Sequence, residues 1–455
     1  MIDAQTKRME PYNVVHVATS GEFLTPLVAS QVFDHAEAQA TLGDADQPLS
    51  VSAWLFEPMR RHLEFPTRRK LRELRRRCPH VDVRLVAGIG RWNNWPAVAT
   101  ARWLRRRLGL ARVVYHCRGE FSAEWALEVR RSFPSDAVVL DVRGAWPYEV
   151  LLAKGVTRVE DARGETRTAF EAALAKLRHC IELADGVTTV SENLKKWLVE
   201  AANAPAETTV IPCCVSSTVD DRNRDVIRRS WGITNEKVYV YLGTTVSRSQ
   251  GLEDLVMPFL RASQIVSADV RALLLTPDLD AMRGLAHRAG LDPERTMIMH
   301  VPQADVRHVL TAADVGLLLR PAIFMNRWSQ PTKLGEYLAS GLPVIVEEGT
   351  GDVPTMLAAS EAGLTVHLGA SGVSIAEEAQ RAYVWVRESG GAARQRARQL
   401  AERDFLWRSV SPTIRKLYRQ SLQRRSAVSD RSEASPVSIG SPSESPRTLL
   451  RAADR

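Results

Sequence analysis

Short apolar runs alternate with helical patterns in a regular series from about residue 237 onward, and this alternation constrains the fold more than any other feature. The runs are nearly continuous in Val, Leu and Ile, as expected for parallel strands that helices cover on both faces. We therefore expect a doubly wound α/β domain in the second half of the chain. Its predicted strands are residues 238–242, 272–275, 297–301, 315–319, 344–346 and 364–367.

The first half repeats the same alternation less regularly. Its predicted strands are residues 14–18, 83–86, 113–115, 137–140, 187–190 and 210–211, and its predicted helices are residues 68–77, 97–107, 123–131 and 168–183. The chain has 455 residues, which is too long for one hydrophobic core, so we expect two such domains facing across a cleft.

Changes of pattern predict the domain boundaries. We expect a first domain at residues 1–216, a second domain at 217–390 and a further helix at 391–420. From residue 421 onward Ser, Pro, Arg and Glu dominate. Because this composition buries too little apolar area to offset the entropy of ordering, we predict a disordered tail at 421–455.

Residues 330–346 read QPTKLGEYLASGLPVIV and predict a loop, a short helix, a tight turn and a buried strand. Pro331 suits a first helical turn, and apolar residues recur at helical spacing up to Gly341. The N–H groups at the helix start, the positive end of its dipole and the Lys333 ammonium together favour a diphosphate. Glu336, one turn further on, is placed to accept hydrogen bonds from a ribose.

This segment resembles the donor-site motif of GT-B glycosyltransferases. It is most similar to the retaining glycosyltransferase family 4, also called glycosyl transferases group 1, whose members carry a Lys-Leu-x-Glu-Tyr-x-Ala-x-Gly-x-Pro-Val-Ile pattern. The resemblance covers most of residues 14–390 and implies an α/β GT-B fold of two Rossmann-like domains, a nucleotide diphosphate sugar as donor, and no metal or other cofactor. In such proteins a C-terminal helix commonly crosses back onto the first, acceptor-side domain. The residues of this segment expected to bind the donor are Thr332, Lys333, Leu334 and Glu336.

Catalytic groups are expected at the carboxyl edge of the first sheet, where open α/β folds bind ligands. His116 follows a predicted strand, and in the resembled family a histidine at this point approaches the donor sugar. Asp141 and Arg143 follow another strand and offer a carboxylate and a guanidinium on one side of the backbone. The alternative interpretations are a structural histidine and a buried Asp–Arg ion pair. Gly21, after the first strand, would let the backbone approach the donor closely.

The loop after the first strand of the second domain departs from the family pattern. Relatives usually place an arginine after its first glycine and a lysine before its second, where this chain has Thr244 and Gln250. Arg248 is the predicted substitute, because a guanidinium holds phosphate oxygens in a bidentate manner.

A second departure concerns the wall that faces the sugar. Trp328 stands where many members have a sugar-binding glutamate. We therefore expect Asn326, Arg327 and Ser329 to form the part of the site that faces the sugar.

Positive charge is concentrated in the first domain, and the formal net charge of the whole chain is +8. On the predicted helix at 68–77, Arg68, Arg72 and Arg75 share one side and leucines occupy another. This basic face indicates docking to anionic lipid headgroups or to a lipid-pyrophosphate acceptor, and the alternative is a solvated helix face. Nucleic acid is not an expected partner, because no aromatic-interleaved basic strand or zinc pattern accompanies the charge.

The sequence predicts a cytoplasmic protein. Residues 1–13 lack the apolar core of a signal peptide, and no apolar run approaches the roughly 20 residues that span a bilayer. Peripheral attachment to the inner face of the membrane would then depend on the basic face. The 5 cysteines show no metal-type pairing with histidines and are expected to be reduced thiols.

These patterns predict a glycosyltransferase that moves a sugar from a nucleotide diphosphate sugar to a hydroxyl acceptor. The resemblance implies retention of the anomeric configuration, and a glycan or lipid-linked acceptor in polysaccharide assembly suits the basic first domain. One alternative is a nucleotide-sugar epimerase on the same fold, which would need an acid/base carboxylate pair and no acceptor. Another is a non-catalytic nucleotide-sugar-binding protein, which the departures from the family pattern suggest.

Overall fold

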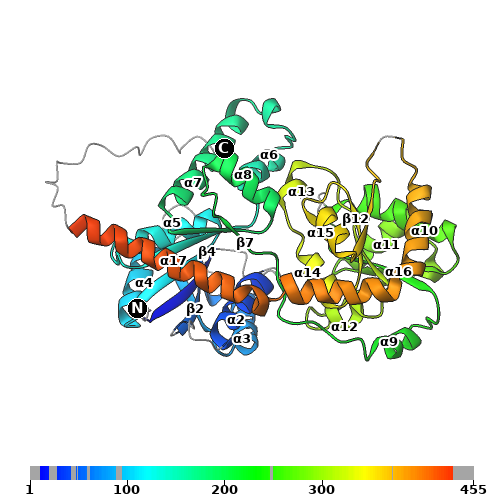
Figure 1. Cartoon of the computed structure of the whole chain (residues 1–455), viewed down its shortest axis with the longest axis horizontal. Coiled ribbons are helices and arrows are strands. Elements are labelled where there is room, and N and C mark those ends of the chain that lie inside the picture. The colour runs from blue at the N-terminus through cyan, green and yellow to red at the C-terminus, as the bar shows by residue number, and fades with distance from the viewer. Residues whose placement is uncertain are drawn as a thin grey trace, which may run out of the picture.

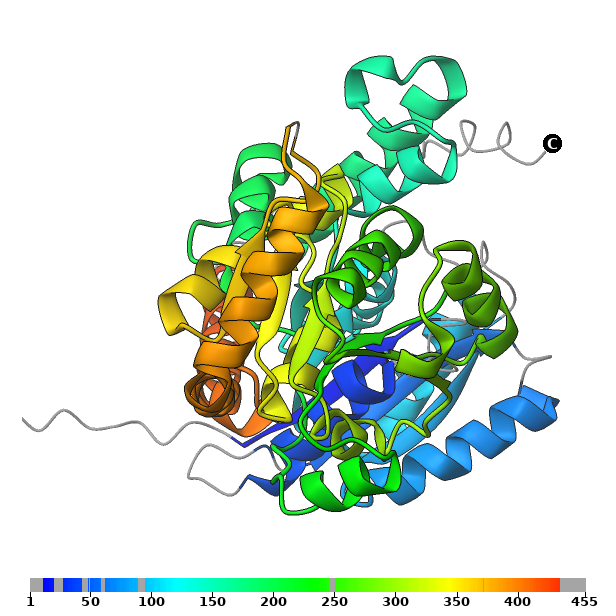
Figure 2. The same cartoon turned by 90° about the vertical axis from the view of Figure 1, so that its right-hand side faces the viewer.

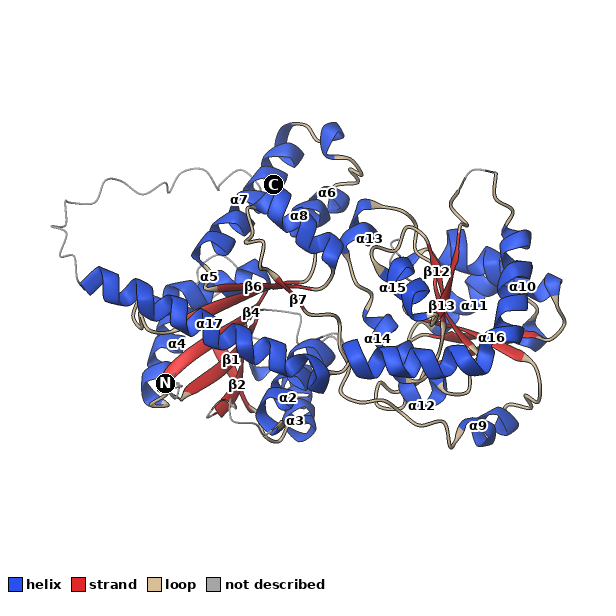
Figure 3. Ribbon diagram, viewed as in Figure 1, coloured by secondary structure: helices blue, strands red, loops and turns tan. Residues whose placement is uncertain are grey.

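A computed structural model of the protein describes residues 11–19, 28–42, 48, 50–58, 62–88, 95–245, 250–370 and 372–433. These residues form two α/β domains that lie side by side, each built round one sheet (Figure 1, Figure 3). The strands of the first sheet are β1 (Tyr12–Ala18), β2 (Ser50–Pro58), β3 (Asp82–Gly88), β4 (Arg112–Arg118), β5 (Ala137–Val142), β6 (Gly186–Thr189) and β7 (Thr209–Val210). Those of the second sheet are β8 (Lys237–Leu242), β9 (Val270–Leu275), β10 (Thr296–Met299), β11 (Val315–Leu318), β12 (Val344–Glu347) and β13 (Gly363–Val366).

Both sheets have the same winding. The strand order is β3-β2-β1-β4-β5-β6-β7 in the first and β10-β9-β8-β11-β12-β13 in the second. The pairings between these strands are parallel. In each sheet the chain starts in the middle and reverses its direction of travel once, between β1 and β4 and between β8 and β11. The predicted doubly wound α/β architecture is therefore confirmed.

Helices connect the strands and cover both faces of each sheet. In the first domain they are α2 (Asp34–Thr41), α3 (Phe65–Arg77), α4 (Trp95–Arg107), α5 (Gly119–Arg130), α6 (Trp146–Ala153), α7 (Gly164–Leu183) and α8 (Glu192–Ala202). The helices that follow are α9 (Arg224–Ser230), α10 (Met257–Val266), α11 (Leu279–Arg288), α12 (Val306–Leu310), α13 (Phe324–Trp328), α14 (Thr332–Ala339), α15 (Val353–Ser360), α16 (Ile375–Asp404) and α17 (Trp407–Glu433). Short 3-10 or π-helical turns cover Ala29–Phe33, Val159–Asp161, Leu252–Val256 and Pro293–Arg295.

The first sheet separates two hydrophobic cores. Successive residues of β1 alternate between them, because side chains of a strand point to opposite faces. Val15 and Val17 belong to the core under α4, α5, α7 and α8, whereas Val14 and Ala18 belong to the core under α2, α3 and α17. No helix among the described residues is both long enough and apolar enough to cross a bilayer.

The last two helices connect the domains. α16 packs on the second sheet, and α17 crosses back onto the first (Figure 1). This second crossing lies beside the first, which is the segment around Val215. The N–H of Val215 donates to the carbonyl of Phe405 at 2.9 Å, and the N–H of Trp407 donates to the carbonyl of Val215 at 3.1 Å. The helix expected at 391–420 is thus the end of α16 and the start of α17, separated by a break at Phe405 and Leu406.

Two further expectations differ from the structure. The predicted strands omit β2, whose polar residues Ser52 and Glu57 hide the pattern, although both side chains are buried in the sheet. The predicted tail begins at Ser421, but α17 continues to Glu433 because Ser421 and Leu422 are buried against the first domain. Residues 434–455 lie outside the described part of the chain.

A glycine in β11 fixes how closely α14 approaches the second sheet. A Cβ atom at Gly316 would lie 2.7 Å from the ring of Tyr337, a distance at which something must shift. The Tyr337 hydroxyl accepts a hydrogen bond from the N–H of Leu242 at 3.0 Å, so the ring is held over the strands. Tyr337 of α14 can therefore approach β11 this closely because residue 316 has no side chain.

Gly316→Ala should lower the free energy of unfolding by about 1 to 3 kcal/mol, because overpacking displaces the buried Tyr337 ring. Gly390→Ala is the matched control, since a Cβ there meets nothing within 4 Å and replaces a glycine inside α16. The control should keep the wild-type stability or gain up to about 1 kcal/mol. Thermal unfolding followed by circular dichroism measures both, and wild-type stability of Gly316→Ala would contradict the packing argument.

Candidate functional site

The strongest candidate site lies where the strand order of the second sheet reverses. Open α/β sheets bind ligands outside the carboxyl ends of their strands at this point. Gly243 follows β8, Arg320 follows β11, and α14 begins at Thr332 after Pro331, so the predicted helix from Pro331 to Gly341 is found with small differences at its ends. These elements bring three loops to one edge of the sheet.

The amino group of Lys333 lies at this edge of the sheet. Its Nζ donates to Oε1 of Gln250 at 2.5 Å and lies 4.6 Å from the centre of the Tyr241 ring. The same Oε1 accepts a hydrogen bond from the Tyr241 hydroxyl at 2.6 Å. A Cβ atom at Gly243 would clash with Nζ of Lys333, so the glycine is what admits the lysine. Gln250 thus supplies an uncharged acceptor.

Arg320 is a second cation at the same edge. Among the described residues, its Nη1 makes long contacts, at 3.4 Å, with Oδ1 of Asn326 and Oγ of Ser329. Burial lowers the pKa of Arg320 to about 10. Burial and then the charge of Arg320 hold the pKa of Lys333 well below its ordinary value.

Within the described part of the chain, neither Lys333 nor Arg320 forms an ion pair with a carboxylate. Both side chains are partly buried, and cations withdrawn from water are normally paired, because removing a charge from water is costly. Two neighbouring cations without a carboxylate, at the carboxyl edge of an α/β sheet, are an anion-binding arrangement.

Glu336 lies one helical turn beyond Lys333 in α14. Its Oε1 accepts a hydrogen bond from Nε2 of Gln303 at 3.2 Å, and its Oε2 lies 3.4 Å from Nε of Arg307. Burial raises the pKa of Glu336, and the nearby Arg307 opposes this shift. The carboxylate is therefore oriented by α12 and the loop before it.

The other residues predicted to bind the donor fall in different places. Ser329 contacts Arg320, and Thr332 is the first residue of α14. Leu334 is a correction: its side chain is fully buried in the core of the second domain, and its N–H donates to the carbonyl of Pro331 at 3.0 Å. We therefore remove Leu334 from the candidate donor contacts. Gly21 and Arg248 lie outside the described residues.

The structure brings the three candidates of the first domain together. Nη1 of Arg143 donates to Oδ2 of Asp141 at 2.9 Å, and Nε2 of His116 lies 3.8 Å from the same oxygen. Burial would raise the pKa of Asp141, but Arg143 and then His116 outweigh it and hold this pKa well below its ordinary value. His116 is only 6% exposed, so the cluster is enclosed between the sheet and α17.

Hydrogen bonds between the two domains connect this cluster to the carboxyl edge of the second sheet, where Lys333 and Arg320 lie. Nη2 of Arg143 lies 3.2 Å from Sγ of Cys213, and the N–H of Cys213 donates to Oε1 of Gln330 at 2.5 Å. Gln330 directly precedes Pro331, the N-cap of α14. The buried Asp141–Arg143 pair therefore positions the link between the domains and the helix that carries Lys333.

Trp328 joins the domains by packing. Its ring centre lies 4.6 Å from that of Tyr148 and 5.3 Å from that of Trp197, both in the first domain. Its carbonyl accepts a hydrogen bond from Oγ of Ser191 at 2.8 Å. Trp328 thus contributes to the contact between the domains.

Comparisons with protein-family models and with curated proteins return no match. Solved structures do match. The sucrose-phosphate synthase of Thermosynechococcus elongatus aligns over 90% of this chain and 98% of its own, with a TM-score of 0.62 and 16% identity. HepE of Anabaena, solved in complex with UDP and glucose, aligns over 89% of this chain and 98% of its own, with a TM-score of 0.61 and 14% identity. The α,α-trehalose 6-phosphate synthase of Burkholderia multivorans aligns over 95% of this chain and 100% of its own, with a TM-score of 0.55 and 10% identity.

These structures are GT-B proteins. The chain has the GT-B fold. At such low identities the likeness shows the fold, so the activity has to be argued from the residues of the site.

Arg320 is the site residue that the sequence analysis missed. It follows the predicted strand at 315–319 directly, and a single arginine after an apolar run is the one signal that marks it. Its place in the site can be recognised only in the assembled sheet, because the pairing of β8 with β11 brings Arg320 near Lys333.

Binding of UDP should be accompanied by proton uptake. The pKa of Lys333 is lowered in the free protein and would be raised again by a diphosphate, so between these two values binding adds a proton. The affinity for UDP should therefore fall as pH rises through this window, which begins below the ordinary lysine value of about 10.4. Calorimetry at one alkaline pH in two buffers of different ionisation enthalpy measures the uptake.

Lys333→Met should reduce this uptake, with Arg320 supplying the remainder, and weaken UDP binding by about 1 to 3 kcal/mol, the range for a charge-assisted hydrogen bond. Lys154→Met, at an exposed position of the first domain, is the control. Equal proton uptake in wild type and Lys333→Met would exclude Lys333 as the titrating group.

Proposed function

We propose that this protein is a glycosyltransferase that moves a sugar from a nucleotide diphosphate sugar to a hydroxyl acceptor, with retention of configuration. The observation that carries the proposal is the pair of partly buried cations, Lys333 and Arg320, at the carboxyl edge of the second sheet. Their combined charge suits a diphosphate. The similar fold of HepE, solved with UDP and glucose, supports a nucleotide-linked donor.

Negative charge develops on the diphosphate when its bond to the anomeric carbon breaks. Lys333 and Arg320 stabilise this charge, and charge pairs are worth more in a partly buried site than in water. The departing oxygen takes the proton of the acceptor hydroxyl, so the proposed step uses no metal. Glu336 accepts hydrogen bonds from the ribose, while Gln303 and Arg307 hold its carboxylate.

The first domain supplies positioning in this proposal. Asp141 and Arg143 are buried and act through Cys213 and Gln330 on the start of α14. His116 belongs to the same enclosed cluster. We therefore assign these three residues to the alignment of the domains, behind the surface that meets the sugar.

We also propose that the acceptor side docks on an acidic membrane through α3, which would suit a lipid-linked acceptor in polysaccharide assembly. Figure 2 shows α3, in blue, at the edge of the first domain. Arg68 and Arg72 are exposed, and Leu63 and Phe65 next to them are 72% and 69% exposed. Arg75 donates to the carbonyl of Val83 at 2.9 Å, which ties the helix to β3. Exposed apolar side chains beside arginines are typical of a helix that binds the membrane surface.

A panel of nucleotide sugars tests the transfer activity. The tag-free protein should slowly release the nucleoside diphosphate from one donor, because water replaces the missing acceptor. Lys333→Met should reduce this release strongly. Isomerised donor would indicate an epimerase, and binding without release would indicate a non-catalytic protein.

Vesicle sedimentation tests the docking surface. Binding to phosphatidylglycerol vesicles should decrease with added salt, because surface attraction is screened within about 10 Å at 0.1 M. Arg68→Glu with Arg72→Glu should reduce it as well, and Phe65→Ser should reduce it even at low salt. Arg283→Glu, on an exposed face of the second domain, is the control. Equal binding by all variants would show that α3 is a solvated helix face that does not bind the membrane.

A further inference from the structure

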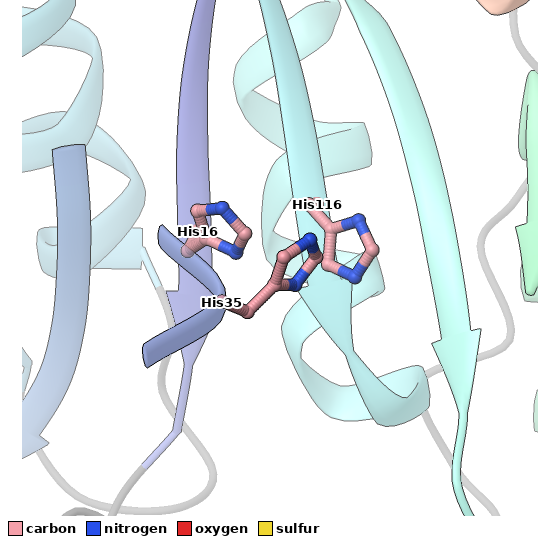
Figure 4. A group of neighbouring side chains, drawn as sticks. All are labelled: His16, His35 and His116. Atoms are coloured by element: carbon pink, nitrogen blue, oxygen red, sulfur yellow. The ribbon is translucent and has the colours of Figure 1, made fainter. Parts of the chain in front are cut away.

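Three histidines meet inside the first domain, between the sheet and α2 (Figure 4). His16 lies in β1 and His116 lies opposite it in the register of β4, whereas His35 comes from α2. The ring centres are 4.6 Å apart for His16 and His35, 4.9 Å for His35 and His116, and 5.1 Å for His16 and His116. One nitrogen from each ring lies within 4.8 Å of the other two.

Apolar side chains border the triad, and the Asp141–Arg143 ion pair lies beside His116. Val14, Ala18 and Val114 from the same strands belong to the core that α2 and α17 cover. Nε2 of His16 is buried and has no hydrogen-bond partner among the described residues. Polar atoms in such a core normally have a partner, so the arrangement indicates a further ligand.

The three rings are suited to bind a cation. A neutral imidazole ring offers one nitrogen lone pair to a cation, and Nε2 of His16 is a buried nitrogen without a hydrogen-bond partner among the described residues. Nδ1 of His116 meets the Tyr418 hydroxyl at 3.0 Å, which leaves its Nε2 for another partner. Oδ2 of Asp141, at 3.8 Å from this Nε2, places negative charge beside it.

We infer that His16, His35 and His116 bind one transition-metal ion of the zinc type. Neutral imidazole is a preferred ligand of Zn²⁺, Co²⁺ and Ni²⁺, whereas Mg²⁺ and Mn²⁺ prefer oxygen. Tetrahedral bonds of about 2.0 to 2.1 Å place ligand nitrogens roughly 3.4 Å apart, so small rotations of the rings close the triad round an ion. Asp141 or a water molecule completes the coordination.

One contact outside the triad matches that of a ligating histidine. Such residues usually donate the N–H of their second nitrogen to a polar group, which fixes the orientation of the ring. The Tyr418 hydroxyl in α17 does this for His116, because its oxygen can accept a hydrogen bond from Nδ1–H at 3.0 Å. The ion would hold β1, β4 and α2 together and support the seat of α17. Its role is structural, so it is compatible with a transfer step that uses no metal.

Metal analysis of tag-free protein refolded with ZnCl₂ and then desalted tests the inference. One zinc per chain should remain, and CoCl₂ in its place should give the visible absorption of tetrahedral cobalt. His35→Gln and His116→Gln should lose the ion, and Tyr418→Phe should bind it about 10- to 100-fold more weakly. His287→Gln, at an exposed position of α11, is the control and should retain it.

If the triad variants do not fold, crystals of the wild-type protein grown with ZnCl₂ test whether zinc binds between the three rings. An anomalous peak between the three rings is expected. Zinc lost from the wild type on desalting, full retention by folded His35→Gln, or a peak only at other histidines would overturn the inference.

Discussion

All the strands of both sheets run parallel, and this decides where apolar and polar groups lie. Each strand has to be reached by a crossover, so helices cover both faces of the sheets and the faces become apolar cores. The carboxyl ends of the strands share one edge, where loops hold polar side chains without entering the cores. Gly243 and Arg320 lie on this edge in the second domain, and Arg143 lies on it in the first. The candidate donor site and the contacts between the domains follow from that geometry.

The departures from the family pattern change the distribution of charge at the donor edge. Thr244 and Gln250 are uncharged, so they do not add two more cations to the partly buried pair of Lys333 and Arg320. The oxygen of Gln250 instead accepts a hydrogen bond from Lys333. Arg320, which follows the neighbouring strand β11, is the second cation at this edge.

The second sheet could be predicted from the sequence because its strands are buried on both faces and read as unbroken apolar runs. β2 could not be predicted, because Ser52 and Glu57 are polar residues whose burial becomes visible only in the assembled sheet. Lys333 and Glu336 could be found because they belong to one continuous motif. Arg320 could not, since its relation to Lys333 depends on two strands that are distant in sequence. The histidine triad was hidden for the same reason: its members come from two neighbouring strands and a helix.

The paired crossings at Val215 and Trp407 make the second domain an insertion within the first. Both β1, near the start of the described chain, and α17, near its end, pack in the first domain. A force that pulled these two elements apart would therefore act on the first domain, and it would reach the second only after α17 had been peeled from its sheet. The two crossings lie side by side with backbone hydrogen bonds between them. A change in the relative orientation of the domains would therefore have to bend or twist these two segments and also separate Trp328 from Tyr148 and Trp197.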